Sequence, residues 1–120
     1  MKIAVPVETK GQDPAVSASF GRAAYFLIYD EETNSTQTLE NTAAQSAGGA
    51  GIKAAQIVAD SGAGVLITPQ CGENAAKVLL AAGLKLYKTS PSLGAMDNIK
   101  AFREGKLEIL VEIHEGFHGH

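Results

Sequence analysis

The chain has 120 residues, 45% of them hydrophobic and 19% charged, which is enough for one domain with a single core. Thirteen acidic residues against ten basic ones give a net charge of -3, which argues against a general nucleic-acid-binding protein. No apolar run approaches the roughly 20 residues of a membrane-spanning helix. A single cysteine excludes an internal disulfide framework and fits a reducing compartment, so we expect a cytoplasmic protein.

The N-terminal third of the chain predicts three strands. Residues 2–7 (KIAVPV) alternate as a strand does, and their apolar part is too short for a signal peptide. A loop with glycine, aspartate and proline follows over residues 8–19. The aromatic and β-branched run 25–29 (YFLIY) predicts the second strand, and residues 36–39 predict a third that pairs with it as a hairpin across the polar turn 30–35.

The remainder of the chain alternates helices with strands. A glycine-rich segment over residues 41–51 fits a binding loop, because it joins two clear elements. Helices are predicted over residues 52–59, 74–82 and 95–103, and strands over residues 65–67 and 84–87. Residues 107–113 (LEILVEI) fit a further strand, and a parallel one would bring His114 back towards the carboxyl ends of the other strands.

This order predicts a three-layer α/β/α domain over residues 1–113, with a flexible histidine-containing tail over residues 114–120. Right-handed crossovers and the hairpin give a five-stranded mixed sheet in the order 3-2-1-4-5, with the second strand antiparallel. Ligands bind at the carboxyl edge of such sheets, where the loops 8–23, 41–51, 68–73 and 88–94 would meet. The predicted core consists of Ile3, Val5, Phe26, Ile28, Ile57, Val65, Ile67, Val78, Leu79, Leu86, Ile99 and Phe102.

Two of the predicted helices begin at this edge, one after Gly51 and one after Gly72. Helix N-termini offer free N–H groups and a partial positive charge, so they suit an anion. The glycines at 48, 49 and 51 would let the backbone approach a ligand closely. Neither G-x-G-x-x-G nor G-x-x-x-x-G-K-[ST] is present, so the sequence carries no nucleotide-binding fingerprint.

The sequence predicts no catalytic residue. Ribonuclease H chemistry needs carboxylates on the central strand to hold two metal ions, and residues 2–7 contain none. A nucleophile-elbow motif is also missing. We therefore expect a non-enzymatic binding protein.

Several segments resemble a known family. Residues 17–23 (SASFGRA) resemble the SxxFGRA-type signature of the dinitrogenase iron–molybdenum cofactor biosynthesis family, which includes nitrogenase accessory factor-like domains. Residues 49–52 (GAGI), residues 72–79 with Gly83, and residues 105–107 (GKL) resemble the later signatures of this family in order and spacing.

The resemblance implies a ribonuclease H-like fold and a cargo of metal and sulfide. Members of the family carry an iron–sulfur or molybdenum–iron–sulfur precursor, and the similar orange protein holds a molybdenum–copper sulfide cluster. The resemblance therefore implies that this chain binds an anionic iron–sulfur or molybdenum-containing sulfide cluster and meets a cofactor-assembly protein. We expect no nucleic acid or membrane partner, and a monomer or weak homodimer. The alternatives are a small-molecule or nucleotide-binding regulatory module that uses the same glycine-rich edge, and an interaction domain without a ligand.

Cys71 is the first candidate metal ligand. A thiolate is the natural ligand of iron, copper and molybdenum–sulfur centres. At the start of a helix the thiol pKa is expected to fall, which would favour the thiolate. The alternative is a small buried hydrophobic side chain. One cysteine cannot complete a site alone, so a cluster would also need histidines, a second chain or non-covalent binding.

Three histidines lie in the tail at spacings that suit one metal ion. They are His114, His118 and His120, and the alternative is that they belong to a solvated segment without a ligand. We predict Cys71, His114 and His118 as the metal ligands, with Cys71 the more important because its loop is fixed before binding.

Arg22 is the candidate cation of the site. Its planar guanidinium suits an anion, and the alternative is a structural ion pair with Asp13 or Asp30. The predicted cofactor-binding residues are Arg22, Gly48, Gly49, Ala50, Gly51, Cys71 and Gly72.

Overall fold

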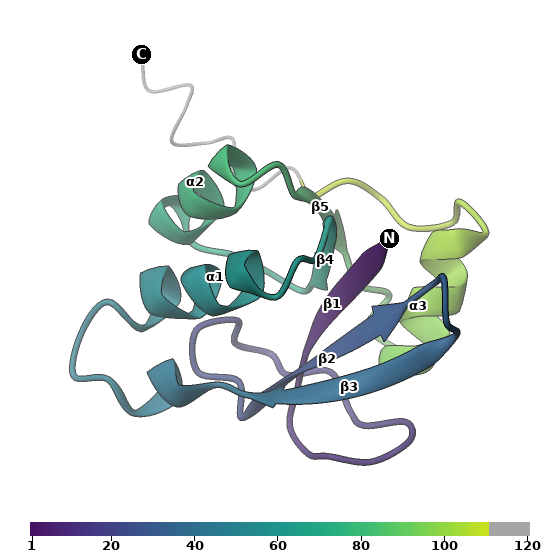
Figure 1. Cartoon of the computed structure of the whole chain (residues 1–120), viewed down its shortest axis with the longest axis horizontal. Helices are drawn as coiled ribbons and strands as arrows, with labels where there is room; N and C mark the ends of the chain where they lie inside the picture. The colour runs from purple at the N-terminus through teal and green to yellow at the C-terminus, as the bar shows by residue number, and fades with distance from the viewer. Residues whose placement is uncertain (111–120) are drawn as a thin grey trace.

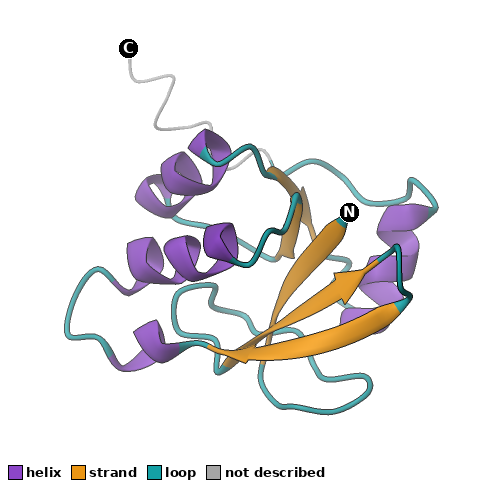
Figure 2. Cartoon of the chain, in the orientation of Figure 1, coloured by secondary structure: helices purple, strands orange, loops and turns teal. Residues whose placement is uncertain are grey.

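The computed structural model describes residues 1–110 and shows one sheet between two layers of helix (Figures 1 and 2). The elements are β1 (Lys2–Val7), β2 (Tyr25–Asp30), β3 (Ser35–Glu40), the 3₁₀ helix η1 (Thr42–Gln45), α1 (Ala50–Asp60), β4 (Val65–Thr68), α2 (Glu73–Ala81), β5 (Lys85–Lys88) and α3 (Ala95–Arg103). The predicted helices and the five numbered strands all form near their expected bounds, whereas η1 was not expected. None of the helices in residues 1–110 is long and apolar enough to cross a membrane.

The sheet has the predicted strand order β3-β2-β1-β4-β5. β2 runs antiparallel to both β1 and β3, while β4 is parallel to β1 and β5 is parallel to β4. Figure 1 shows α1 and α2 side by side on one face of the sheet and α3 on the other. The expected three-layer α/β fold with a mixed sheet is therefore confirmed.

Each face of the sheet has its own apolar core, because successive strand residues point to opposite sides. Phe26 of β2 packs in the core under α1 and α2, and its neighbour Leu27 packs in the core under α3. Most of the predicted core residues are buried as expected. Three of them, Ile57, Val78 and Phe102, are only partly buried and pack against the edges of the cores.

The segment after α3 differs from its expected course. Tyr87 and Ile109 form an isolated antiparallel bridge, in which the Lys88 N–H donates to the Glu108 carbonyl at 2.8 Å. The chain thus meets β5 at its carboxyl end and runs back along it, so the expectation of a parallel strand is wrong for residues 107–110. This direction leads away from the carboxyl edge, and the remainder of the expected strand, residues 111–113, lies outside the described residues.

Candidate functional site

Three of the predicted loops meet around one hollow of about 450 Å³ at the carboxyl edge of the sheet. Figure 1 shows the N-terminal ends of α1 and α2 on the same side of the molecule, beside this edge. The lining residues come from the loop after β1, from the start of α1 and from the loop and first turn of α2: Ser19, Phe20, Gly21, Arg22, Gly49, Ala50, Gly51, Ile52, Gln70, Gly72, Glu73, Asn74 and Ala75. The fourth predicted loop, residues 88–94, does not line the hollow.

The two helices that border the hollow begin without a capping side chain. Their N-cap residues are Gly49, in the left-handed region with φ +68°, and Gly72, in an extended conformation. The N–H groups of residues 50–52 and 73–75 find no hydrogen-bond acceptor among the described residues. Six donors and two positive helix ends are therefore available to a ligand or to water.

The third helix shows the opposite arrangement. The Asp13 carboxylate accepts a hydrogen bond from the Met96 N–H at 3.1 Å, and the Pro14 carbonyl accepts one from the Ala95 N–H at 3.1 Å. A negatively charged side chain thus satisfies the start of α3, as is usual for helix N-termini. The two helices that begin at the hollow therefore lack a side-chain cap, whereas α3, which begins elsewhere, has one.

Gly21 and Gly51 bring two walls of the hollow into direct backbone contact. A Cβ atom on Gly21 would lie 3.0 Å from both the N and the Cα atoms of Gly51. A side chain at position 21 would therefore push the loop after β1 away from the first turn of α1. This close packing favours glycine at position 21.

Arg22 has a structural partner that the sequence did not predict. Its Nη1 atom donates to the carbonyls of Ala44 and Ser46 at 2.8 and 2.9 Å, at the end of η1. In the described part of the chain its guanidinium pairs with no carboxylate, so the alternative of an ion pair with Asp13 or Asp30 is not realised. The side chain is exposed and lines the hollow, where it adds a fixed positive charge.

Cys71 lies in the apolar core and not on the wall of the hollow. The residue is 9% exposed and packs in the same core as Phe20 and Ala75. Burial raises the pKa of the Cys71 thiol from 9.0 to about 11. The expected fall in this pKa is therefore wrong, because burial removes the solvent that would stabilise the thiolate.

The remaining predicted site residues divide into three groups. Gly49, Ala50, Gly51 and Gly72 line the hollow, whereas Gly48 does not, and their role in binding a cofactor stays a prediction. His114, His118 and the further candidate His120 lie outside the described residues, so the role of His114 and His118 as metal ligands stays a prediction. Across residues 1–110, no three histidine, cysteine or acidic side chains gather as a metal-binding group.

Two residues that shape the hollow were missed. The Gln70 Nε2 atom donates to the Ala18 carbonyl at 3.2 Å and joins the loop before α2 to the loop after β1. Asn41 is buried at the N-cap of η1, and its side chain joins η1 to residues 21 and 23. An asparagine directly before a short helical segment is a capping signal, which could have identified Asn41.

The hydroxyl and the carboxylate that line the hollow each have a partner within the protein. The hydroxyl, that of Ser19, accepts a hydrogen bond from the Arg22 N–H at 3.2 Å. The carboxylate, that of Glu73, forms an ion pair with Lys77, one turn further along α2, at 3.6 Å. The free N–H groups of α1 and α2 lie beside the Arg22 guanidinium, and this combination favours an anion.

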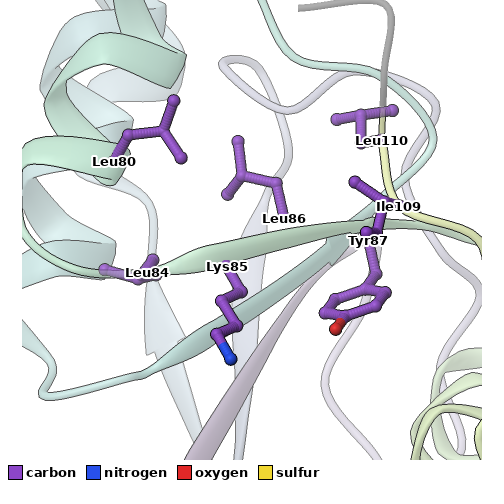
Figure 3. A pocket seen from close by; sticks show the side chains of 7 residues that line it. All are labelled: Leu80, Leu84, Lys85, Leu86, Tyr87, Ile109 and Leu110. Carbon is purple, nitrogen blue, oxygen red and sulfur yellow. The ribbon is translucent and has the colours of Figure 1, made fainter.

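A second hollow, of about 190 Å³, is lined by the end of α2, by β5 and by residues 109–110. Figure 3 shows leucine side chains facing it from α2 and β5, next to Ile109 and Leu110. Its wall is mostly apolar and presents no converging donors, so it does not share the chemistry of the first hollow.

Comparisons with known proteins agree with this geometry. Residues 1–105 match the family described as dinitrogenase iron-molybdenum cofactor. The chain is 33% identical over 112 residues to an uncharacterized protein of Methanocaldococcus jannaschii, covering 90% of each chain. It is 38% identical to the apo form of the orange protein from Desulfovibrio gigas, with a TM-score of 0.85 over 90% of this chain and 91% of the other. A Thermotoga protein of the DUF35 family, a candidate NifB protein solved by NMR, is also 38% identical and covers the same shares of the two chains, with a TM-score of 0.76. The chain therefore belongs to the dinitrogenase iron–molybdenum cofactor family.

Proposed function

We propose that this protein is a non-enzymatic carrier of an anionic metal–sulfur cluster, which it holds in the hollow between residues 19–22 and the starts of α1 and α2. Family membership supports the metal–sulfur nature of the cargo. One observation carries the proposal: α1 and α2 leave six N–H donors free at one hollow, while Asp13 caps α3. Such an array favours a ligand with negative charge spread over several acceptor atoms.

The donor set indicates how the cluster would be held. No cysteine or histidine within residues 1–110 lines the hollow, so the described wall offers no thiolate or imidazole ligand to a metal. A cluster whose outer atoms are sulfides could instead accept hydrogen bonds from residues 50–52 and 73–75 and pair with Arg22. We assign Cys71 a supporting place beneath the loop, since its thiol is buried and protonated at neutral pH.

Carriage also implies a recipient. A cargo held by hydrogen bonds and charge can leave without breaking a bond to the protein, which suits transfer to a cofactor-assembly protein. The likeness to a candidate NifB protein supports a partner of that kind.

Anaerobic reconstitution with iron or molybdate and sulfide tests the proposal, read by visible absorption and metal analysis. We expect the wild-type chain to take up a coloured cluster. Arg22→Ala should weaken uptake, with a smaller difference at high salt because the side chain is exposed. Cys71→Ser and a chain that ends at Ile113 should retain the cluster.

Three results would contradict parts of this proposal. Loss of uptake in Cys71→Ser alone would restore the thiolate as the essential ligand. Loss of uptake only in the shortened chain would assign the metal to the histidines of residues 114–120. A colourless wild-type protein that retains a nucleotide would favour the regulatory module that uses the same edge.

A further inference from the structure

Asn41 is buried between β3 and η1, and every polar atom of its side chain is used. Asn41 is only 3% exposed. Its Nδ2 atom donates to the carbonyls of Gly21 and Ala23, at 3.1 and 2.8 Å. Its Oδ1 atom accepts from the Ala43 N–H at 3.1 Å. Because both acceptors are carbonyls, the opposite amide orientation would place oxygen against oxygen, so the orientation is fixed.

Through Gly21, this amide sets the distance between two walls of the hollow. Gly21 lies against the backbone of Gly51, and a Cβ atom there would be 3.0 Å from the Gly51 N atom. Gly51 belongs to the first turn of α1, whose N–H groups are free. A shift of the Gly21 carbonyl therefore changes where the loop after β1 meets the donors of α1.

The same amide also holds η1, the short helix whose carbonyls accept hydrogen bonds from Arg22. Arg22 follows Gly21 in the chain, and its guanidinium returns to the carbonyls of Ala44 and Ser46. Those carbonyls close η1, whose N-terminal end is capped by Asn41. The hydrogen bonds thus form a closed ring from η1 to residues 21–23 and back to η1.

We propose that Asn41 is a positioning residue for the anion site, one that does not line the hollow but holds Gly21 and Arg22 in register with the start of α1. This inference rests on the proposed function, because it names the residue that organises the same hollow. Without the two donated bonds, the guanidinium and the N–H groups of α1 would no longer face one ligand together.

The test compares Asn41→Asp with Asn98→Asp. Aspartate at position 41 keeps the acceptor for the Ala43 N–H and removes both donors. Asn98 is a matched control, since it is fully buried, donates from Nδ2 to the carbonyls of Ser90, Leu93 and Gly94, and accepts from the Ser90 N–H. It fixes the loop between β5 and α3, which does not line the hollow.

Two readouts are measured well below the unfolding temperature of each variant. The first is the dissociation constant for tetrathiomolybdate, a sulfide-terminated anion. We expect Asn41→Asp to raise it roughly 10-fold, in the range found for outer-shell changes at metal sites, and Asn98→Asp to leave it near the wild-type value. The second is the amide NMR spectrum of the free protein, in which only Asn41→Asp should move the resonances of Gly21, Arg22 and Gly51.

The outcomes separate this inference from the proposed function. If the wild-type protein binds the probe and the two variants bind it equally well or equally badly, Asn41 is merely structural and the inference is wrong. If the wild-type protein does not bind the probe, the proposed function fails, and the resonances of the free proteins alone decide whether Asn41 positions the hollow. If Asn41→Asp does not fold, Asn41→Ser, which keeps one hydroxyl donor, is compared with Asn98→Ser by the same two readouts.

Discussion

Cys71 lies beneath the loop that leads into α2, and its environment governs the chemistry of its thiol. Burial raises its pKa to about 11, above the ordinary value of 9.0. The folded state therefore keeps a proton that the unfolded chain loses at lower pH. The stability contributed by the neutral thiol is fully present below pH 9 and is lost as the pH rises towards 11.

We predict that the wild-type protein loses on the order of 1–3 kcal/mol of stability over this range relative to Cys71→Ala. Urea unfolding of the two proteins at a series of pH values measures the difference, and the variant removes the effect of other groups that titrate there. At neutral pH the thiol should also react slowly with iodoacetamide. A stability difference that is independent of pH would show that the thiol is not buried as described.

Substitution by alanine is expected to affect the free energy of unfolding differently at Gly21 and at Gly48. A methyl group at position 21 would meet the Gly51 backbone at 3.0 Å, whereas nothing lies within 4 Å of a Cβ atom at position 48. We predict that Gly21→Ala lowers the free energy of unfolding by about 1–3 kcal/mol, because backbone atoms must shift. Gly48→Ala should change it by less than about 1 kcal/mol. Equal effects in denaturant unfolding would contradict the close contact between positions 21 and 51.

Helix α2 lacks a stabilising side-chain cap at its N-terminus. Gly72 has an extended conformation that an N-cap side chain adopts, and a Cβ atom there meets nothing within 4 Å. We predict that Gly72→Asp stabilises the protein by about 1 kcal/mol, because its carboxylate would cap the free N–H groups. The same carboxylate would occupy the hollow with negative charge, so binding of an anionic cluster should weaken.

Gly72→Ser separates the two effects. Its hydroxyl can cap α2 without adding charge, so the gain in stability should remain while binding falls less than in the aspartate variant. Thermal unfolding measures stability, and titration with tetrathiomolybdate measures binding. If Gly72→Asp binds the anion as well as the wild-type protein does, the start of α2 is not part of the site.

At the scale of the whole molecule, the sequence predicted what depends on periodic patterns. Alternating apolar residues identified β1, and apolar residues at helical spacing identified the helices that alternate with later strands. Because such helices connect parallel strands by right-handed crossovers, this alternation predicted the strand order. The meeting of three loops at the carboxyl edge followed from that order alone. The direction of residues 107–110 did not follow, because it depends on where the chain leaves α3.

The contacts inside the loops could not be predicted from the sequence, for a physical reason. Whether Arg22 meets a carboxylate or two carbonyls depends on backbone positions that no periodicity sets. The same holds for Asp13, which caps α3 from more than eighty residues away. The burial of Cys71 likewise arises from how the loop turns, and side-chain type alone did not reveal it.

The hollow exists only in the folded protein, because its walls come from three separate segments. An anion that binds there should stabilise the native state alone, by about 2.7 kcal/mol at a free concentration of 100 times Kd. For a domain of this size we predict a rise in the unfolding midpoint of roughly 10–20 °C. Scanning calorimetry with tetrathiomolybdate measures this rise, and Gly72→Asp should show less of it at the same concentration. Sulfate at that concentration is the control for general anion effects, and an equal rise with sulfate would mean that the hollow does not select a sulfide-terminated cluster.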